Sequence, residues 1–115
     1  MIKRIQAGPR MSQAVVHGQT VYLAGQVADD PKADVTTQTR QVLASIDRLL
    51  AAAGSDKTRI LRANIFLKDI GSFAEMNKVW DAWVAQGHTP ARATVQSALA
   101  TPDYLVEIVV TAALP

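Results

Sequence analysis

The sequence has no cysteine, few aromatic residues and no long apolar run, and each shortage excludes a class of protein. Without cysteine there can be no disulfide framework, no thiolate metal site and no cysteine nucleophile. No stretch approaches the roughly 18 apolar residues of a membrane-spanning helix. The charged start, Met1 to Ile5, precedes no apolar run of the kind that a signal peptide needs. We therefore expect a soluble, cytoplasmic protein that does not associate with membranes.

Two further shortages narrow the range of partners. Only two histidines are present, His17 and His88, and neither has a carboxylate or a second imidazole at metal-ligand spacing. The net charge is only +2, because twelve Lys and Arg are scattered among ten Asp and Glu, and 5% of the residues are aromatic. Single-stranded RNA is usually bound by aromatic side chains within a basic groove. We therefore expect no metal ion, and the sequence does not favour nucleic-acid binding.

The sequence does contain enough apolar residues for one core. It has 115 residues, of which 49% are hydrophobic, and this is the size and composition of one domain. It shows no internal repeat, low-complexity stretch or linker. Residues 1–115 are therefore predicted to form a single domain.

The first half of the chain predicts a hairpin and a helix. Residues 12–16 and 20–26 are partly β-branched runs, and Gly18 between them can adopt the positive φ that a tight turn needs. After the predicted N-cap Asp34, apolar or small residues recur every three or four positions, which is the pattern of one helical face. Gly54 is expected to end this helix.

The middle of the chain predicts a strand and a second helix. Residues 60–68 alternate in polarity, and one face would carry Leu61, Ala63, Ile65 and Leu67. Ser72 and Glu75 then match the capping-box pattern of a helix start. The helix that follows would end at Gly87 and would present apolar side chains to the core: Phe73, Met76, Val79, Trp80, Trp83 and Val84.

Two last strands, at residues 91–99 and 104–113, complete an α+β arrangement with the order ββαβαββ and six strands at most. Two helices can cover only one face of such a sheet. The other face would expose apolar positions such as Phe66 and Val109, and copies of the same chain would be the simplest cover. The sequence therefore predicts one mixed sheet, two helices on one face, and an oligomer.

The closing strands also carry the residues that could support chemistry. Arg92, Thr94 and Gln96 share one face of their strand, and we expect this polar face to point away from the helices. Glu107 stands alone between apolar neighbours, where a carboxylate seldom stays without a partner. Arg92 and Glu107 could form a reactive pair, or could simply pair with each other or with solvent at a sheet surface or subunit contact. Asn77, at the margin of the aromatic stripe, could be a site residue or an amide satisfied by backbone.

Five segments of this sequence, in order and spacing, resemble the RidA/YjgF family: Val21–Gln26, Phe66–Asp69, Phe73–Asn77, Pro90–Val95 and Val106–Ile108. The resemblance covers nearly the whole chain. Segments Met76–Trp83 and Ala91–Gln96 are most similar to the short YoaB-like branch of that family.

This resemblance implies a fold, an assembly and a reaction. The fold would be chorismate-mutase-like, in a homotrimer whose sheets form a central barrel with three clefts at the subunit contacts. The reaction would be hydrolysis of reactive 2-enamine or 2-imino acids, such as 2-aminoacrylate, to 2-oxo acids and ammonia, with no metal or organic cofactor. By the same resemblance, Arg92 would bind the substrate carboxylate, Glu107 would orient water and move protons, and Asn77 would lie at the cleft.

Three positions depart from the family pattern, and we expect all three to line the pocket. Thr94 stands where many deaminating members have cysteine, Ala24 where they have serine, and Met11 where they have tyrosine. This altered lining leaves two alternatives open. One is a non-catalytic trimer that binds small carboxylate metabolites, and the other is the RNA-binding or ribonuclease role attached to some family members.

Overall fold

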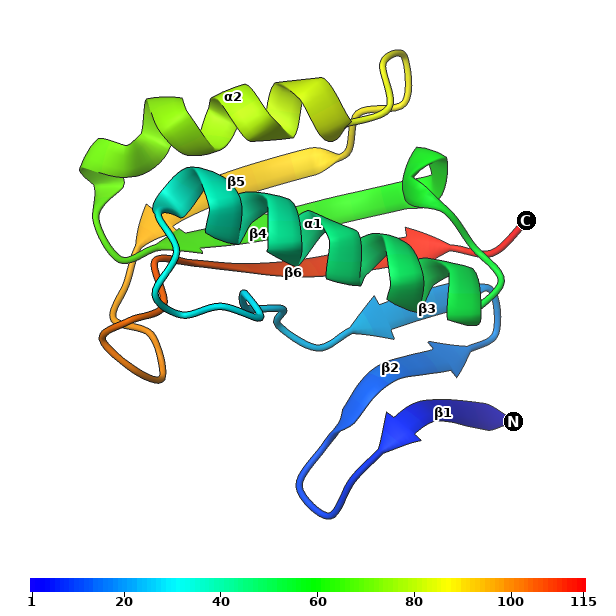
Figure 1. Ribbon diagram of the computed structural model, residues 1–115. Helices are drawn as coiled ribbons and strands as arrows, with labels where there is room; N and C mark the ends of the chain where they lie inside the picture. The colour runs from blue at the N-terminus through cyan, green and yellow to red at the C-terminus, as the bar shows by residue number, and fades with distance from the viewer.

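The computed structural model describes all 115 residues and contains six strands and two long helices (Figure 1). The helices are α1 (Val35–Ala52) and α2 (Phe73–Trp83), and two short 3₁₀ helices, Lys57–Arg59 and Ile70–Ser72, precede β4 and α2. The strands are β1 (Ile2–Ala7), β2 (Ser12–His17), β3 (Thr20–Leu23), β4 (Ile60–Leu67), β5 (Ala91–Gln96) and β6 (Val106–Ala113).

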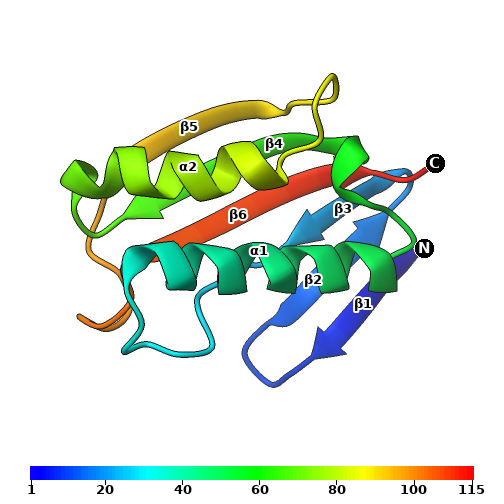
Figure 2. The same cartoon turned by 45° about the horizontal axis from the view of Figure 1, so that its top comes forward.

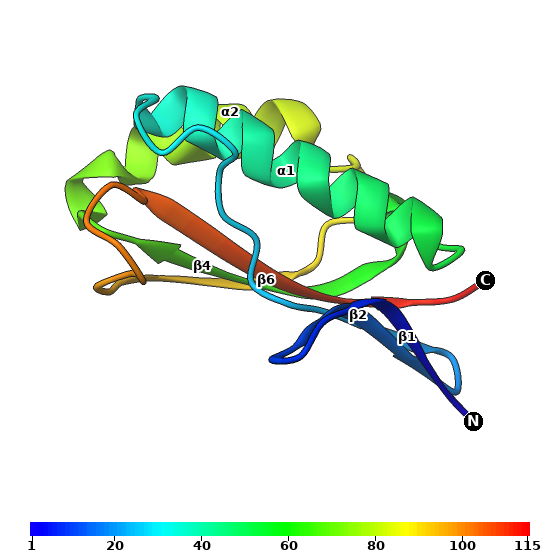
Figure 3. The same ribbon diagram turned by 60° about the horizontal axis from the view of Figure 1, so that its bottom comes forward.

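All six strands form one sheet in the order β1-β2-β3-β6-β4-β5. The β4–β5 pair is parallel and every other pair is antiparallel, with α2 as the crossover between the two parallel strands. Both helices lie on the same face of this sheet, and its other face is uncovered (Figure 3). The predicted six-stranded mixed sheet with two helices on one face is confirmed.

The predicted order ββαβαββ lacked the first strand, β1. This strand pairs with β2 in antiparallel register, from Ile2 opposite His17 to Ala7 opposite Ser12. Five of its six residues are exposed and only Ile5 packs partly against the core, so β1 has no fully buried face. A strand without a buried face has no reason to alternate apolar and polar residues, and the sequence therefore carried no signal for it.

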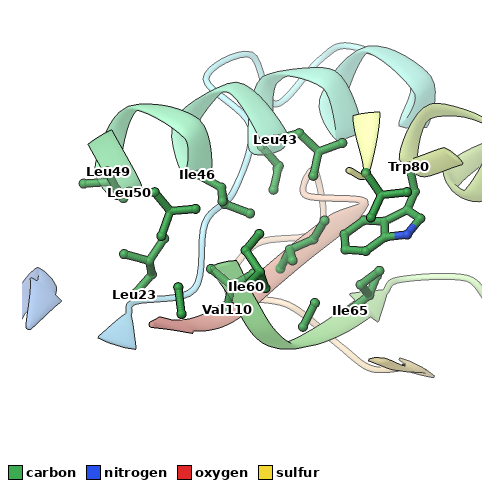
Figure 4. Close-up of a cluster of buried hydrophobic side chains, with 14 of the residues drawn as sticks. Leu23, Leu43, Ile46, Leu49, Leu50, Ile60, Ile65, Trp80 and Val110 are labelled. Atoms are coloured by element: carbon green, nitrogen blue, oxygen red, sulfur yellow. The ribbon is translucent and has the colours of Figure 1, made fainter. Parts of the chain in front are cut away.

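The core lies between the helices and the sheet (Figure 4). Leu43, Ile46 and Leu50 of α1 point toward the strands and are at most 2% exposed. On the sheet, Ile65 and Val110 face them from β4 and β6. Spacing of three and four residues places the α1 side chains on one stripe, as the sequence predicted.

The two helices begin and end differently. Asp34 caps α1 as predicted, since its side chain accepts a hydrogen bond from the backbone N–H of Thr37 at 2.8 Å. Gly54, with φ of 88°, follows the last turn of α1. The capping-box prediction for α2 was wrong: Ser72 makes no side-chain capping bond, because it belongs to a 3₁₀ turn that Asp69 caps instead. At Ser72 the backbone is therefore already turning, and its hydroxyl is not aimed at the α2 amides.

The end of α2 also differs from the prediction. The helix stops at Trp83, and Val84 takes the extended backbone with φ of −59° and ψ of 140°. This turn buries the Val84 side chain, which is 8% exposed. Gly87, with φ of 82°, lies beyond the helix in a turn that His88 closes with a hydrogen bond from its backbone N–H to the carbonyl of Ala85.

A bulge changes the faces of β4. The pairing of β4 with β6 shifts between Ile60 and Arg62. Ile60 is consequently buried at the start of the strand, while Leu61 is 53% exposed. The prediction that Leu61 shares the buried face was wrong for this reason, and it holds for Ala63, Ile65 and Leu67, all fully buried.

The observed ends of three strands differ from the predicted ends by two or three residues. Gly18, with φ of 60°, forms the predicted turn between β2 and β3. The strand after it ends at Leu23, three residues earlier than expected, although Gln26 still forms one bridge with Ile108. Strand β5 ends at Gln96 instead of residue 99, and β6 starts at Val106 instead of residue 104. None of the helices is both long enough and apolar enough to pass through a bilayer.

Candidate functional site

Arg92 lies on the edge strand β5 and points toward α2. Its Nη1 donates a hydrogen bond to Oδ1 of Asn77 at 2.7 Å. The guanidinium carbon lies 5.3 Å from the ring centroid of Trp80 and 5.8 Å from that of Phe73. Arg92 is thus held by two aromatic rings and one amide, all supplied by α2.

The orientation of Arg92 corrects an expectation drawn from the sequence. We expected the polar face of this strand to point away from the helices, and instead it faces α2. A guanidinium is planar and weakly hydrated, so it stacks on aromatic faces more readily than an ammonium does, with a gain of about 0.5–2 kcal/mol per ring. The aromatic stripe of α2 therefore attracts the polar side of β5.

The same contact with Arg92 provides the hydrogen bond of the Asn77 amide oxygen. This oxygen accepts from a side chain and not from the backbone. The bond uses one N–H of Arg92 and leaves the other N–H donors of the guanidinium for an anion. A planar guanidinium fixed in this way can hold a carboxylate through two parallel hydrogen bonds.

Thr94 is two residues beyond Arg92 on the same face of β5. In the parallel register it lies beside Ile65, whose side chain is fully buried. The Thr94 hydroxyl oxygen is buried and has no hydrogen-bond partner within the chain. Buried polar atoms are almost always satisfied, so this unpaired hydroxyl is an exception that the contacts within one chain do not explain. Arg92, Asn77 and Thr94 together form what we call the arginine cluster.

Glu107 lies on the uncovered face of the sheet. Its neighbours Val106 and Ile108 on β6 are fully buried under the helices, while Glu107 is half-buried opposite Phe66 of β4. The carboxyl group rests against the backbone of Gly25, in the space where a Cβ atom would lie. Two backbone hydrogen bonds between Gln26 and Ile108, at 2.9 and 3.1 Å, hold these two segments together.

Ala24 and Met11 lie at the same end of the sheet as Gly25. The backbone N–H of Ala24 donates to the carbonyl of Gln13 at 2.9 Å, and its carbonyl accepts from the Gln26 side chain. Met11 stands two residues before Gln13, immediately before β2, and is 47% exposed. We call Glu107, Gly25 and Ala24 the glutamate cluster, with Met11 at its margin.

Within one chain, the two clusters lie on opposite faces of the sheet. Arg92 pairs in register with Ala63 of β4, whose side chain is fully buried on the helix side. Glu107 pairs with Phe66, three residues further along β4 and on the other face. Arg92 and Glu107 therefore do not pair with each other inside one chain. If they act together, a second copy must bring them together.

The uncovered face has apolar side chains that could serve such a contact. Tyr22 of β3 and Val95 of β5 are 50% and 48% exposed. Phe66 and Val109 lie between them and are half-buried, on the face where the sequence placed them. An apolar surface that spans four strands is typical of a protein–protein contact.

The histidines and carboxylates are dispersed. No group of three or more His, Cys, Asp or Glu side chains lies close enough together to hold a metal ion. His17 ends β2 and His88 lies in the turn after α2, and both are exposed.

Sequence reasoning missed one residue of the glutamate cluster, Gly25, and two aromatic residues that contact the arginine cluster, Trp80 and Phe73. Trp80 was expected to be core, and it is 5% exposed, but it also carries the Arg92 guanidinium. Phe73 was expected in the core and is 41% exposed, because it stacks at the edge of the same guanidinium. Gly25 had a signal, since a glycine inside a strand pattern indicates a close approach of another group.

Comparison with known proteins places this geometry in a family. The chain matches the family model described as endoribonuclease L-PSP over residues 1–114. The RutC family protein YoaB of Escherichia coli (strain K12) is 50% identical over 113 residues, which cover 98% of this chain and 98% of that protein. A RutC family protein of Haemophilus ducreyi is 44% identical over 114 residues, which cover 99% and 97%.

Solved structures agree with these sequence matches. NMB1025, a member of the YjgF protein family from Neisseria meningitidis, has a TM-score of 0.97 and 48% identity, over 100% of this chain and 96% of that chain. Rv2704 from Mycobacterium tuberculosis, a member of the YjgF/YER057c/UK114 family, has a TM-score of 0.91 and 27% identity, over 99% of this chain and 100% of that chain.

Proposed function

Because this chain belongs to the YjgF/RidA family, whose fold supports a role with small-molecule metabolites, we propose that it hydrolyses reactive 2-enamine and 2-imino acids. The substrates belong to the 2-aminoacrylate class, and the products are 2-oxo acids and ammonia. The observation that carries this proposal is the caged guanidinium of Arg92, which is preorganised for a carboxylate and retains free N–H donors.

The site would form between two copies of the chain. Arg92 and Glu107 lie on opposite faces of one sheet, and the uncovered face around Glu107 is apolar. A second copy that packs its β5 edge against this face would bring an arginine cluster to a glutamate cluster. In a closed ring of three copies, each contact would contain one such cleft.

In this cleft, Arg92 orients the substrate through its carboxylate, so that the adjacent imine carbon faces Glu107. An enamine substrate first tautomerises to its imine. Glu107 accepts a proton from water as the water oxygen attacks the imine carbon, and it then passes this proton to the nitrogen to give a carbinolamine. The carbinolamine then collapses. Glu107 transfers the hydroxyl proton to the amino nitrogen, the C–N bond breaks, and ammonia and a 2-oxo acid are released. An imine is already electrophilic, so the residues of the cleft need only to position groups and to transfer protons.

The test measures 2-oxo acid and ammonia release from freshly generated imines of several amino acids. Arg92→Ala should lower the enzymatic acceleration by about 100-fold or more, because the substrate loses its orientation, while the fold and the oligomer stay intact. Arg59→Ala, which removes another arginine from an exposed 3₁₀ helix, serves as the control and should keep the wild-type rate. Wild-type rates in Arg92→Ala would refute the proposal.

One observation favours a second candidate, a non-catalytic protein that binds small carboxylates. The arginine cluster is complete within one chain, but the glutamate cluster is on the opposite face. Pyruvate binding that requires Arg92, without any acceleration of imine hydrolysis by the wild-type protein, would select this alternative. The same preparation should be assayed with RNA, since binding or cleavage that falls steeply with salt would instead support a nucleic-acid substrate.

A further inference from the structure

Helices α1 and α2 both lie on one face of the sheet (Figure 2), and side chains of both helices line a groove between them. Its volume is about 510 Å³, within the range of about 300–1,000 Å³ that small-molecule sites occupy. Its lining comes from both helices and from Lys57, and none of its residues belongs to the arginine or glutamate cluster.

The groove exists because small side chains stand between the two helices. Ala44 of α1 and Ala82 of α2 both line it and are both exposed. The apolar side chains of Leu43 and Val79, at most 9% exposed, form its floor. Larger side chains at positions 44 and 82 would close the space between the helices, whereas the two alanine methyl groups leave it unfilled.

The rim of the groove is strongly basic. Arg40, Lys57 and Lys78 line it with a single carboxylate, Asp47. The chain as a whole has nearly balanced charge, with twelve cationic and ten acidic residues. The groove therefore concentrates positive charge beside an apolar floor.

Two charged side chains of the groove, Asp47 and Lys57, are held in place by contacts with Trp83. Oδ2 of Asp47 accepts a hydrogen bond from Nε1 of Trp83 at 2.9 Å. Nζ of Lys57 donates to the Trp83 carbonyl at 2.6 Å and lies 5.3 Å from the centroid of the same ring. These contacts hold an indole and an ammonium in place before any ligand arrives, which lowers the entropic cost of binding.

We propose that the groove between α1 and α2 is a second binding site, and that it takes a small organic anion with an aromatic or branched apolar body. The apolar body lies over Leu43, Val79 and the Trp83 ring, and the acid group lies among Arg40, Lys57 and Lys78. The site is independent of the proposed hydrolysis, because it uses neither Arg92 nor Glu107.

The two tryptophans of the chain make this site directly observable. Trp83 lines the groove, and Trp80 lies 5.3 Å from it, centroid to centroid. The chain contains no other tryptophan. Intrinsic fluorescence therefore reports on the groove without a label through Trp83, and also on the arginine cluster through Trp80, so the Arg92→Ala variant is needed to separate the two.

The experiment titrates the full-length protein with phenylacetate and, separately, with the uncharged phenylacetamide. Phenylacetate should change the tryptophan emission saturably, with a Kd below about 1 mM. The amide should bind at least about tenfold more weakly, because it lacks the charge that the three cations recognise. No saturable change up to about 10 mM phenylacetate, or equal binding of the acid and the amide, would overturn the proposal.

Variants then locate the binding. Ala82→Leu should fill the groove and raise the Kd by about tenfold or more, and the double variant Arg40→Gln/Lys78→Gln should raise it by about tenfold. The matched controls are Ala51→Leu and Lys32→Gln, exposed positions outside the groove, and both should bind as the wild type does. Arg92→Ala should also keep the wild-type Kd, and a loss of binding in that variant would assign the anion to the arginine cluster and refute a second site.

Discussion

The Glu107 carboxyl occupies the place of a missing side chain at Gly25. Glycine permits this close approach because it has no Cβ atom. The colliding atoms would be a carboxyl oxygen and Cδ of Glu107, with Cγ also in tight contact at 3.2 Å, and all of them belong to a side chain that can rotate. A methyl group at position 25 should therefore displace the carboxylate at little cost to the fold.

Gly25→Ala tests the placement of Glu107. We expect the thermal midpoint to stay within about 2 °C of the wild type and imine hydrolysis to fall by about tenfold or more. Gly8→Ala is the matched control, since a Cβ there would meet only the Met11 carbonyl oxygen, at 3.5 Å. Unchanged hydrolysis in Gly25→Ala would show that the observed carboxylate position is not required.

For β5, the sequence predicted which side chains share a face, but it did not predict whether that face points toward the helices. Alternation placed Arg92 and Thr94 together, as the structure confirms. It could not orient them, because the opposite face of β5 carries only Ala91, Ala93 and Val95, which could have met the helices equally well. The aromatic rings that attract Arg92 come from α2, and no local pattern in β5 contains them.

Among the elements, the two helices differ in how their first amides are satisfied. Asp34 bonds directly to the Thr37 N–H of α1, whereas Ser72 makes no capping bond to α2. Both residue types are favoured N-caps, so sequence alone treated them alike. The 3₁₀ turn before α2 made the difference, and its cap, Asp69, was not recognised.

Substitution by alanine should separate the two positions. Asp34→Ala should lower the thermal midpoint by about 5 °C, because α1 loses a cap that nothing replaces. Ser72→Ala should change it by less than about 1 °C, since no bond is lost. Thermal unfolding followed by circular dichroism measures both, and equal effects would contradict the observed capping.

The cap of α1 also predicts a response to acid. The hydrogen bonds from the backbone N–H and then the hydroxyl of Thr37 hold the pKa of Asp34 below its ordinary value. A carboxyl whose pKa is lower in the folded state stabilises the fold above the unfolded pKa of about 3.9, and this contribution is lost as the pH falls through the folded pKa. The thermal midpoint of the wild type should therefore fall between about pH 4 and pH 2 by more than that of Asp34→Asn, whose side chain caps without titrating. Parallel curves for the two proteins would contradict this prediction.

Elements with a buried face were predicted well, and those without one were not. Helix α1 and the buried positions of β4 followed from periodicity, apart from Leu61, which the bulge exposes. Strand β1 exposes five of its six residues, so its position depends on backbone pairing with β2 and on one partly buried side chain, Ile5, that packs against the core. Backbone pairing does not require apolar and polar residues to alternate, so the sequence pattern did not predict this strand.

For the whole molecule, the main open surface is the face of the sheet opposite the helices. It carries Tyr22, Phe66, Val95 and Val109 over four neighbouring strands. The sequence predicted that copies of the chain cover this face. The position of Glu107 on it gives the contact a second role, because the proposed site is incomplete without another copy.

Analytical ultracentrifugation should find a trimer, and Val95→Lys should shift it toward monomer, because the new charge lies on the apolar face. Ile70→Lys is the control, with a similar exposure of 46% at a position outside the sheet. It should leave the mass unchanged. A wild-type protein that sediments as a monomer at micromolar concentration would exclude the proposed composite site.

The position of β6 in the sheet has a consequence for synthesis. Strands β1 to β3 form one half of the sheet and β4 with β5 the other, and only β6, which follows them all in the chain, joins the two halves. The segments of both halves are therefore synthesised before the segment that joins them. Until Val106–Ala113 pairs with both halves, β3 and β4 each keep an unpaired strand edge. During this interval the nascent chain is accessible to chaperones and prone to aggregation.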